Sequence, residues 1–210
     1  MARMKKRPNK KIKAVLFDLG KVVLDFNFEP AFHRLSQSVP LTARELEAYF
    51  WRSGLEVLYD GGKISSVQFY KEVKRVVRHT LSYKQFKKIW NEVFTPKKDT
   101  FALIRRLSPR TRLVLISNTN AMHYEYVRKK YPILNHFDRL ILSFKEKTRK
   151  PDEAIYKTAA KACKAMPQEI FYIDDRRDLT EAAKELGFHT FTYKNNPKAL
   201  VKQMKGMDIL

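Results

Sequence analysis

Five polar residues in this sequence stand at or just after the ends of short apolar runs. Asp18, Ser117 and the pair Asp174-Asp175 each end such a run, and Lys150 follows another run by a loop. A carboxylate can attack phosphorus only where its repulsion from a phosphate dianion is offset, as a divalent cation and a lysine ammonium can do. Asp18, which is followed at once by a turn-forming Leu-Gly, is therefore the candidate nucleophile.

The elements around these residues alternate between strands and helices. The predicted strands are the apolar stretch that begins at Ala14, then 112–117, 139–143, 170–174 and 188–193, and helices are predicted at about 101–107, 121–131, 152–165, 179–186 and 197–205. This alternation favours a parallel sheet covered on both faces, so the predicted fold class is α/β with a doubly wound, Rossmann-like sheet. Ligands bind such sheets beyond the carboxyl ends of the strands, where the polar residues would converge.

The segment 26–95 has a different pattern, with apolar residues at helical spacing. Helix starts are indicated by Pro30, by Thr42 with a glutamate three residues later, and by Ser82. We therefore predict a helical cap at 26–95, inserted into a core formed by 13–25 and 96–210. Trp51 and Trp90 are interpreted as part of the packed interior of that cap.

The chain carries 43 Lys and Arg against 22 Asp and Glu, a formal net charge of +21. Such an excess attracts polyanions without conferring specificity. Residues 1–12 are predicted to be a disordered basic tail. No apolar run is long enough for a membrane span or a signal peptide, so we expect a cytoplasmic location and no membrane partner. The single cysteine, Cys163, excludes an internal disulfide framework and is interpreted as a packing residue.

Four short motifs resemble those of the haloacid dehalogenase-like (HAD) superfamily, in the phosphatase-rich subfamily IA with a small helical (C1) cap. They are Phe-Asp-Leu-Gly-Lys-Val at 17–22, Leu-Ile-Ser-Asn-Thr-Asn at 115–120, Arg-Lys-Pro-Asp at 149–152 and Asp-Asp at 174–175. Within that branch the motifs are most similar to those of the α-D-glucose-1-phosphate phosphatase-like group. The resemblance covers about Lys13 to Tyr193.

The resemblance implies that Asp18 attacks phosphorus to form an aspartyl-phosphate. Mg²⁺ would then be held by Asp18, the backbone carbonyl of Gly20 and Asp175, with Asp174 acting through water. Oxygen ligands with retained waters suit Mg²⁺.

The remaining implied roles concern the phosphoryl group. Ser117 and the backbone amides of Leu19 and Asn118 would hydrogen-bond its oxygens. Lys150 would pair with both Asp18 and the phosphate, which keeps Asp18 ionised and stabilises charge in the transition state.

Three residues depart from the superfamily pattern. Gly20 stands where an Asp usually protonates the leaving group, and general acid catalysis contributes roughly 10²–10⁴-fold. Esters with good leaving groups, such as anomeric sugar phosphates, are therefore the expected substrates. Leu179 replaces a polar residue that usually supports the lysine or the metal. Lys147 replaces a glycine, so a left-handed backbone there would cost about 1–2 kcal/mol.

Substrate recognition is expected on the cap side of the site. Asp25 and Asn27 are candidate substrate-binding residues, and the turn at 59–62 is another place where a sugar or base could be recognised, although its Asp-Gly pair is also a common turn signal. His123 is interpreted as a helix-surface or capping residue.

The sequence thus favours a Mg²⁺-dependent phosphatase acting on a small phosphorylated metabolite, with a sugar 1-phosphate as one candidate. The alternative is a weakly active or non-catalytic relative that binds a phosphorylated ligand or RNA through its basic surface, although nucleic acid is not the favoured partner. A dehalogenase is disfavoured because it would leave Asp174 and Asp175 without a purpose. Nothing in the sequence predicts an oligomeric state.

Overall fold

The computed structural model describes residues 11–210. The basic tail predicted at 1–12 lies outside these residues except for Lys11 and Ile12. Ile12 is buried in the main hydrophobic cluster, so the core begins slightly before the predicted boundary at this point.

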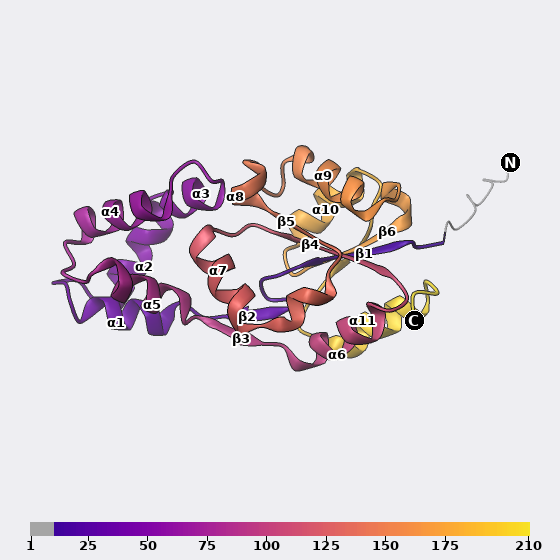
Figure 1. The fold of residues 1–210 in the computed structure, drawn as a ribbon, viewed down its shortest axis with the longest axis horizontal. Helices are drawn as coiled ribbons and strands as arrows, with labels where there is room; N and C mark the ends of the chain where they lie inside the picture. The colour runs from indigo at the N-terminus through magenta and orange to yellow at the C-terminus, as the bar shows by residue number, and fades with distance from the viewer. Residues whose placement is uncertain (1–10) are drawn as a thin grey trace, which may run out of the picture.

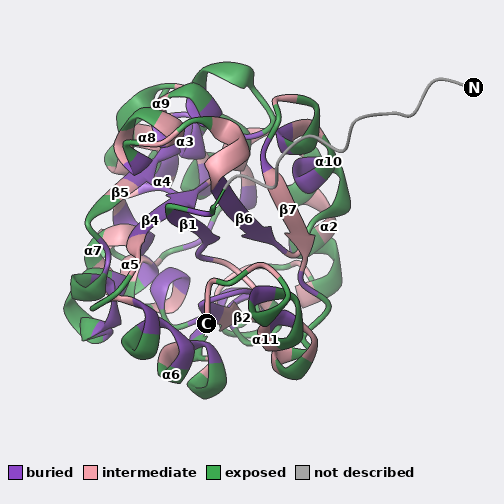
Figure 2. Ribbon diagram, turned by 90° about the vertical axis from the view of Figure 1, so that its right-hand side faces the viewer, coloured by how far each residue is buried: buried purple, intermediate pink, exposed green. Residues whose placement is uncertain are grey.

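Five parallel strands form the central sheet, in the order β5-β4-β1-β6-β7. The strands are β1 (Ala14–Asp18), β4 (Arg112–Ser117), β5 (Arg139–Leu142), β6 (Ile170–Asp174) and β7 (His189–Thr192). Side chains of β1 alternate between two hydrophobic clusters, with Val15 and Phe17 on one face and Ala14 and Leu16 on the other. A strand buried on both faces needs a continuous apolar run, and Figure 2 shows β1, β4 and β6 as buried.

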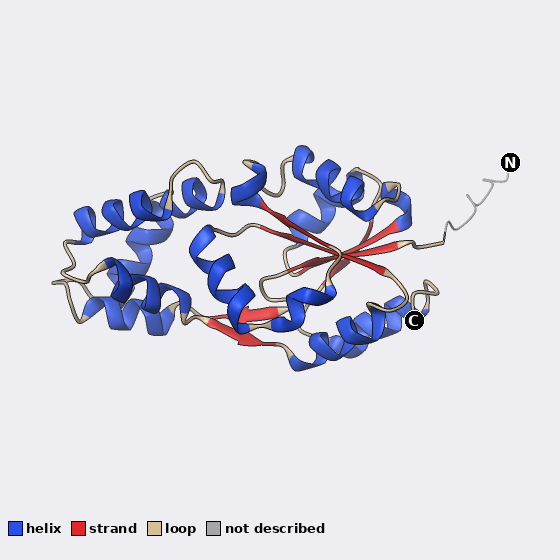
Figure 3. Cartoon of the chain, viewed as in Figure 1, coloured by secondary structure: helices blue, strands red, loops and turns tan. Residues whose placement is uncertain are grey.

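Helices cover both faces of the sheet, which confirms the predicted α/β fold class (Figure 3). One face packs against α6 (Lys98–Leu107), α7 (Ala121–Lys130) and α11 (Pro197–Lys205). The other packs against α9 (Glu153–Cys163) and α10 (Arg177–Glu185), and Cys163 is buried there. Shorter helical turns are α8 (Ser143–Glu146), η1 (Pro132–His136) and η2 (Pro167–Glu169).

The first five helices after β1, on the left in Figure 1, pack around a separate hydrophobic cluster to which Met122 of α7 also belongs. They are α1 (Glu29–Ser36), α2 (Ala43–Arg52), α3 (Leu55–Asp60), α4 (Ser66–Val77) and α5 (Tyr83–Asn91). Capping boxes open α2, α4 and α5 and satisfy the free amides at their N-termini. Trp90 is buried in this cluster, but Trp51 is 46% exposed, contrary to its interpretation as part of the packed interior.

A short antiparallel ribbon joins these helices to the sheet. Its strands are β2 (Leu24–Phe26) and β3 (Phe94–Pro96), with Phe26 opposite Phe94. The first strand of the sheet ends at Asp18, and the chain then turns into β2 through Lys21, which adopts a left-handed conformation with φ 57°.

Within residues 11–210, no helix is both long and apolar enough to cross a membrane.

Candidate active site

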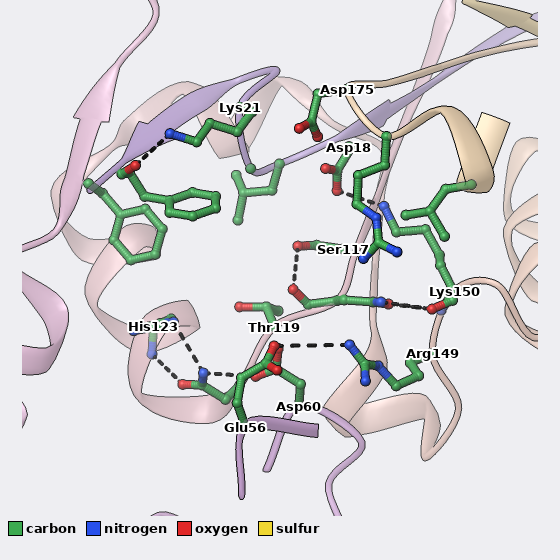
Figure 4. A pocket seen from close by; sticks show the side chains of 18 of the residues that line it. Asp18, Lys21, Glu56, Asp60, Ser117, Thr119, His123, Arg149, Lys150 and Asp175 are labelled. Atoms are coloured by element: carbon green, nitrogen blue, oxygen red, sulfur yellow. Dashed lines mark hydrogen bonds and ion pairs between the residues drawn. The ribbon is translucent and has the colours of Figure 1, made fainter. Parts of the chain in front are cut away.

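A pocket of about 230 Å³ opens at the carboxyl ends of β1, β4 and β6 (Figure 4). Among its lining residues are Asp18, Ser117, Lys150 and Asp175. Asp18 and Ser117 come together because β1 pairs with β4 so that Asp18 lies opposite Ile116, the residue before Ser117. Asp174 is fully buried behind the pocket wall. The sheet therefore brings the four predicted motifs to one place.

Lys150 connects two of the buried carboxylates. Its ammonium lies 2.8 Å from Asp18 Oδ1 and 2.6 Å from Asp174 Oδ2. The loop that carries Lys150 is held by Asn118, whose side-chain amide donates to the Lys150 carbonyl at 2.9 Å and accepts from its backbone N–H at 2.8 Å. The two hydrogen bonds fix where the lysine side chain leaves the backbone.

Burial and the neighbouring opposite charge shift the pKa values of Asp18 and Lys150 in opposite directions. Burial raises the pKa of Asp18 to about 7, Lys150 opposes that rise, and the negative Asp174 adds to it. Burial alone would lower the pKa of Lys150, but the attraction of Asp18 and Asp174 outweighs it and raises that pKa above its usual range. Lys150 is therefore a permanent cation facing the candidate nucleophile.

Three carboxylates could hold a cation beside this lysine. Asp18, Asp174 and Asp175 each place one oxygen within 4.8 Å of the others. Asp174 is already engaged, since its Oδ2 accepts from Lys150 and the Tyr172 hydroxyl and its Oδ1 accepts from the Arg176 amide. Asp175 lines the pocket itself. A set of carboxylate oxygens is the donor chemistry that a hard divalent cation such as Mg²⁺ prefers.

The space beside Gly20 is filled by an aromatic ring. A Cβ added to Gly20 would lie 2.9 Å from Cε1 of Phe26, closer than a real contact allows. Phe26 is confined by edge contacts with Phe28 and Phe94 and by the Lys21 ammonium, 4.5 Å from its ring centroid. Gly20 thus leaves room for Phe26, which also lines the pocket.

The other two departures also have structural counterparts. Leu179, which replaces a polar residue that usually supports the lysine or the metal, is buried at the pocket wall. Asp174, a candidate metal ligand, accepts a hydrogen bond from the Tyr172 hydroxyl. The sequence did not predict this hydrogen bond, because the position of Tyr172 in the pattern is that of one more apolar residue in a buried strand. Lys147 does adopt a left-handed conformation, with φ 58°, and its ammonium donates to the Gly62 carbonyl at 2.7 Å.

Two predicted substrate-binding residues do not line the pocket. Asp25 accepts from the Lys21 ammonium at 2.6 Å, and its carboxylate also accepts from its neighbour's amide. Asn27 accepts from the Glu29 amide at the start of α1. Both side chains are used in local structure at the ribbon, and the structure does not bring them together with the other predicted site residues.

His123 also differs from its interpretation, because it is buried and lines the pocket. Its Nε2 lies 3.1 Å from the Trp90 carbonyl oxygen, and its Nδ1 lies 3.1 Å from Asn120 Nδ2. Burial lowers its pKa to about 4, so the ring is neutral near pH 7.

Further polar residues line the pocket on its other side. Glu56 and Asp60 come from α3, Thr119 follows β4, and Arg149 precedes Lys150. Asp60 falls in the turn that the sequence singled out, whereas Glu56 and Arg149 were missed as lining residues. The signal for Glu56 was its position four residues before Asp60, which places both on one helix face.

Comparisons with known proteins found a matching family model, related sequences and similar solved structures. The family model of haloacid dehalogenase-like hydrolases matches residues 12–187. A D-ribitol-5-phosphate phosphatase from Bacteroides thetaiotaomicron is 27% identical over 194 residues, which cover 88% of this chain and 93% of that protein. A phosphorylated carbohydrates phosphatase from Thermotoga maritima is 24% identical and covers 84% and 82%.

A solved structure of similar fold comes from the same Bacteroides species. It is a HAD family enzyme in complex with magnesium and inorganic phosphate, and it superposes with a TM-score of 0.79 at 27% identity, covering 87% of this chain and 94% of that chain.

Proposed function

Because this chain belongs to the haloacid dehalogenase-like hydrolase family, we propose that it is a Mg²⁺-dependent phosphatase that hydrolyses a small phosphorylated carbohydrate. The observation that carries the proposal is the convergence of Asp18, Lys150 and the Asp174-Asp175 pair at one pocket. The named activities of two relatives, on D-ribitol 5-phosphate and on phosphorylated carbohydrates, support the substrate class.

Asp18 is the nucleophile in the proposed reaction. One of its oxygens forms a bond to phosphorus as the bond from phosphorus to the sugar oxygen breaks, which gives an aspartyl-phosphate and a sugar oxygen that takes a proton from solvent water to become the alcohol. Water then attacks the same phosphorus, which releases inorganic phosphate and restores the Asp18 carboxylate. Lys150 favours the ionised form of Asp18 before the first step and offsets charge on the phosphoryl oxygens in both steps.

The remaining residues position the phosphate. Ser117 and the backbone amides of Leu19 and Asn118 are the proposed hydrogen-bond donors to the phosphoryl oxygens. Asp18, Asp175 and the Gly20 carbonyl would hold Mg²⁺, with Asp174 behind them, and the ion supplies Lewis-acid stabilisation of negative charge on the phosphoryl group.

Gly20 bears on the choice of substrate. No carboxylic acid stands at position 20 to protonate the leaving oxygen, and the Phe26 ring takes up the space of a side chain there. A leaving group of low basicity needs less help from an acid. We therefore expect a sugar 1-phosphate to be hydrolysed faster than the phosphate of a primary alcohol.

Phosphate release from p-nitrophenyl phosphate and glucose 1-phosphate tests the proposal, with Mg²⁺ and with EDTA. The wild-type protein should turn over both esters only with Mg²⁺, and Asp18→Asn should abolish turnover. Asp25→Asn is the matched control, because Asp25 does not line the pocket. Equal rates of phosphate release for wild type and Asp18→Asn would exclude the proposed phosphatase activity. Steeply salt-dependent RNA binding without turnover would favour the basic-surface alternative.

A further inference from the structure

The pocket has a second polar end. Figure 4 shows Glu56, Asp60 and Arg149 grouped away from Asp18 and Asp175, with Ser117 between the two groups. The phosphate chemistry proposed above uses only the Asp18 end. The other end faces whatever is attached to the phosphate.

Asp60 is held in place before any substrate binds. It is only 5% exposed, and its Oδ1 accepts from the Asn120 side-chain amide at 2.9 Å. Its carbonyl accepts from the Ser143 hydroxyl at 2.5 Å, and the neighbouring Tyr59 hydroxyl accepts from the Met122 amide at 3.1 Å. These bonds anchor the end of α3 to the segments that follow β4 and β5, so the carboxyl group is preorganised.

Glu56 and Asp60 lie one helical turn apart on α3, and both line this end of the pocket. Burial, followed by the charge of Glu56, raises the pKa of Asp60 well above its usual range, in agreement with this geometry. The pair therefore offers both a proton donor and several acceptor oxygens.

Arg149 adds donors at the same end. Its Nη2 lies 4.0 Å from Glu56 Oε1, and its Nε is buried without a hydrogen-bond partner among the residues described. This end of the pocket therefore combines two acids with a cation that has an unused N–H group. A neutral group that both donates and accepts hydrogen bonds matches it.

An aromatic wall completes the pocket. Phe28, Trp51 and Trp90 line it, and the Phe28 ring centroid lies 5.6 Å from that of Trp51 and 5.0 Å from that of Trp90. The apolar C–H face of a sugar or polyol can pack on such rings while its hydroxyls reach the polar end.

We propose that Glu56, Asp60 and Arg149 bind the hydroxyl groups of a neutral sugar or polyol, and that the two acids discriminate against substrates with a second anionic group. This inference rests on the proposed phosphatase function and assigns the part of the site that selects the substrate. A carboxylate or second phosphate would face the acid pair, whereas a hydroxyl can donate to one acid and accept from Arg149.

The test compares glucose 1-phosphate with p-nitrophenyl phosphate, an ester without sugar hydroxyls. Glu56→Gln should lower the ratio of kcat/KM for the sugar ester to that for the aryl ester by about 10- to 100-fold, as expected for the loss of a charge-assisted hydrogen bond. Asp60→Asn, which replaces the neighbouring acid, should lower the same ratio. Glu72→Gln, the same change at a glutamate on α4 that is partly exposed like Glu56, should leave the ratio unchanged. The partly exposed Glu56 provides a second variant if Asp60→Asn fails to fold.

A second readout uses a sugar phosphate that carries a carboxylate at its far end. The wild-type protein should discriminate against it relative to glucose 1-phosphate, and Glu56→Gln should reduce that discrimination. The inference would be overturned if folded Glu56→Gln kept the wild-type ratio of kcat/KM for the sugar ester to that for the aryl ester, including the case in which both values fall equally. Absence of Mg²⁺-dependent turnover of either ester by the wild type would instead overturn the proposed function, so the two failures can be told apart.

Discussion

The Lys150 ammonium and the Asp18 carboxylate lie 2.8 Å apart although 132 positions separate the two residues in the chain. Lys150 also contacts Asp174, so one buried cation serves carboxylates at the ends of two neighbouring strands. Catalysis and stability are therefore linked at this residue, because removal of the cation leaves two buried acids facing each other.

Lys150→Met should lower kcat/KM by about 10³-fold, as expected when a charge that stabilises the transition state is lost. It should also reduce the free energy of unfolding by about 3 kcal/mol near pH 8. The loss should be smaller at pH 5, where Asp18, whose pKa burial raises to about 7, takes up a proton and no longer faces Asp174 as a second negative charge. Urea unfolding at both pH values measures this, with the exposed Lys145→Met as control. A pH-independent loss would contradict the explanation.

Gly20→Asp should not restore a general acid by itself. The new Cβ would meet the Phe26 ring at 2.9 Å, so we expect lower stability and lower activity. Combined with Phe26→Ala, which empties that space, Gly20→Asp should act on the phosphate of a primary alcohol faster than Phe26→Ala alone. Steady-state rates for the three variants and the wild type provide the comparison. Higher activity in the single variant would mean that Phe26 does not block the position.

Tyr172→Phe should weaken the support of Asp174 without changing the packing of β6. The hydroxyl donates to Asp174 Oδ2, and loss of a partner behind a metal ligand typically costs 10–100-fold in metal affinity or activity. The apparent affinity for Mg²⁺, taken from the dependence of the rate on its concentration, should fall in this range. Tyr131→Phe is the matched control, since the hydroxyl of this buried tyrosine donates to the Phe94 carbonyl instead. Equal effects from both variants would argue against a specific role for Tyr172.

His123 should make the protein less stable in mild acid. Its pKa is about 4 in the folded chain and 6.5 when exposed, so below pH 6.5 the unfolded chain takes up a proton that the folded chain refuses. The contribution of His123 to the free energy of unfolding is constant above pH 6.5 and falls by about 3 kcal/mol between pH 6.5 and 4. The buried His79 acts in the same direction, and the raised pKa values of Asp18 and Asp60 act in the opposite one.

A comparison with His123→Gln isolates that contribution, because the other groups are present in both proteins. Urea midpoints at pH 7.5, 6 and 5 should fall less steeply for His123→Gln than for the wild type. Parallel curves would show that His123 does not titrate as its burial implies.

The parallel sheet and the convergence of the four motifs at one edge of it could be predicted from the sequence for a physical reason. A parallel strand buried on both faces must be apolar throughout, so the polar residue that ends it is conspicuous, as Asp18 and Asp174 are. The ribbon of β2 and β3 could not be predicted in this way, because three residues are too few for a period to show. The contacts of Phe26 and Tyr172 depend on side chains packed across elements, which spacing along the chain does not encode.

The ribbon also bears on how such a protein can change over evolutionary time. Phe26 and Phe94 face each other across β2 and β3, so the chain leaves and re-enters the sheet domain at adjacent points. The helices between β2 and β3 form an insertion whose two ends are already held together by the ribbon, and lengthening such an insertion costs little conformational entropy. The hydrolytic centre can therefore be inherited intact while the intervening helices, and with them Glu56 and Asp60, are replaced to suit another metabolite.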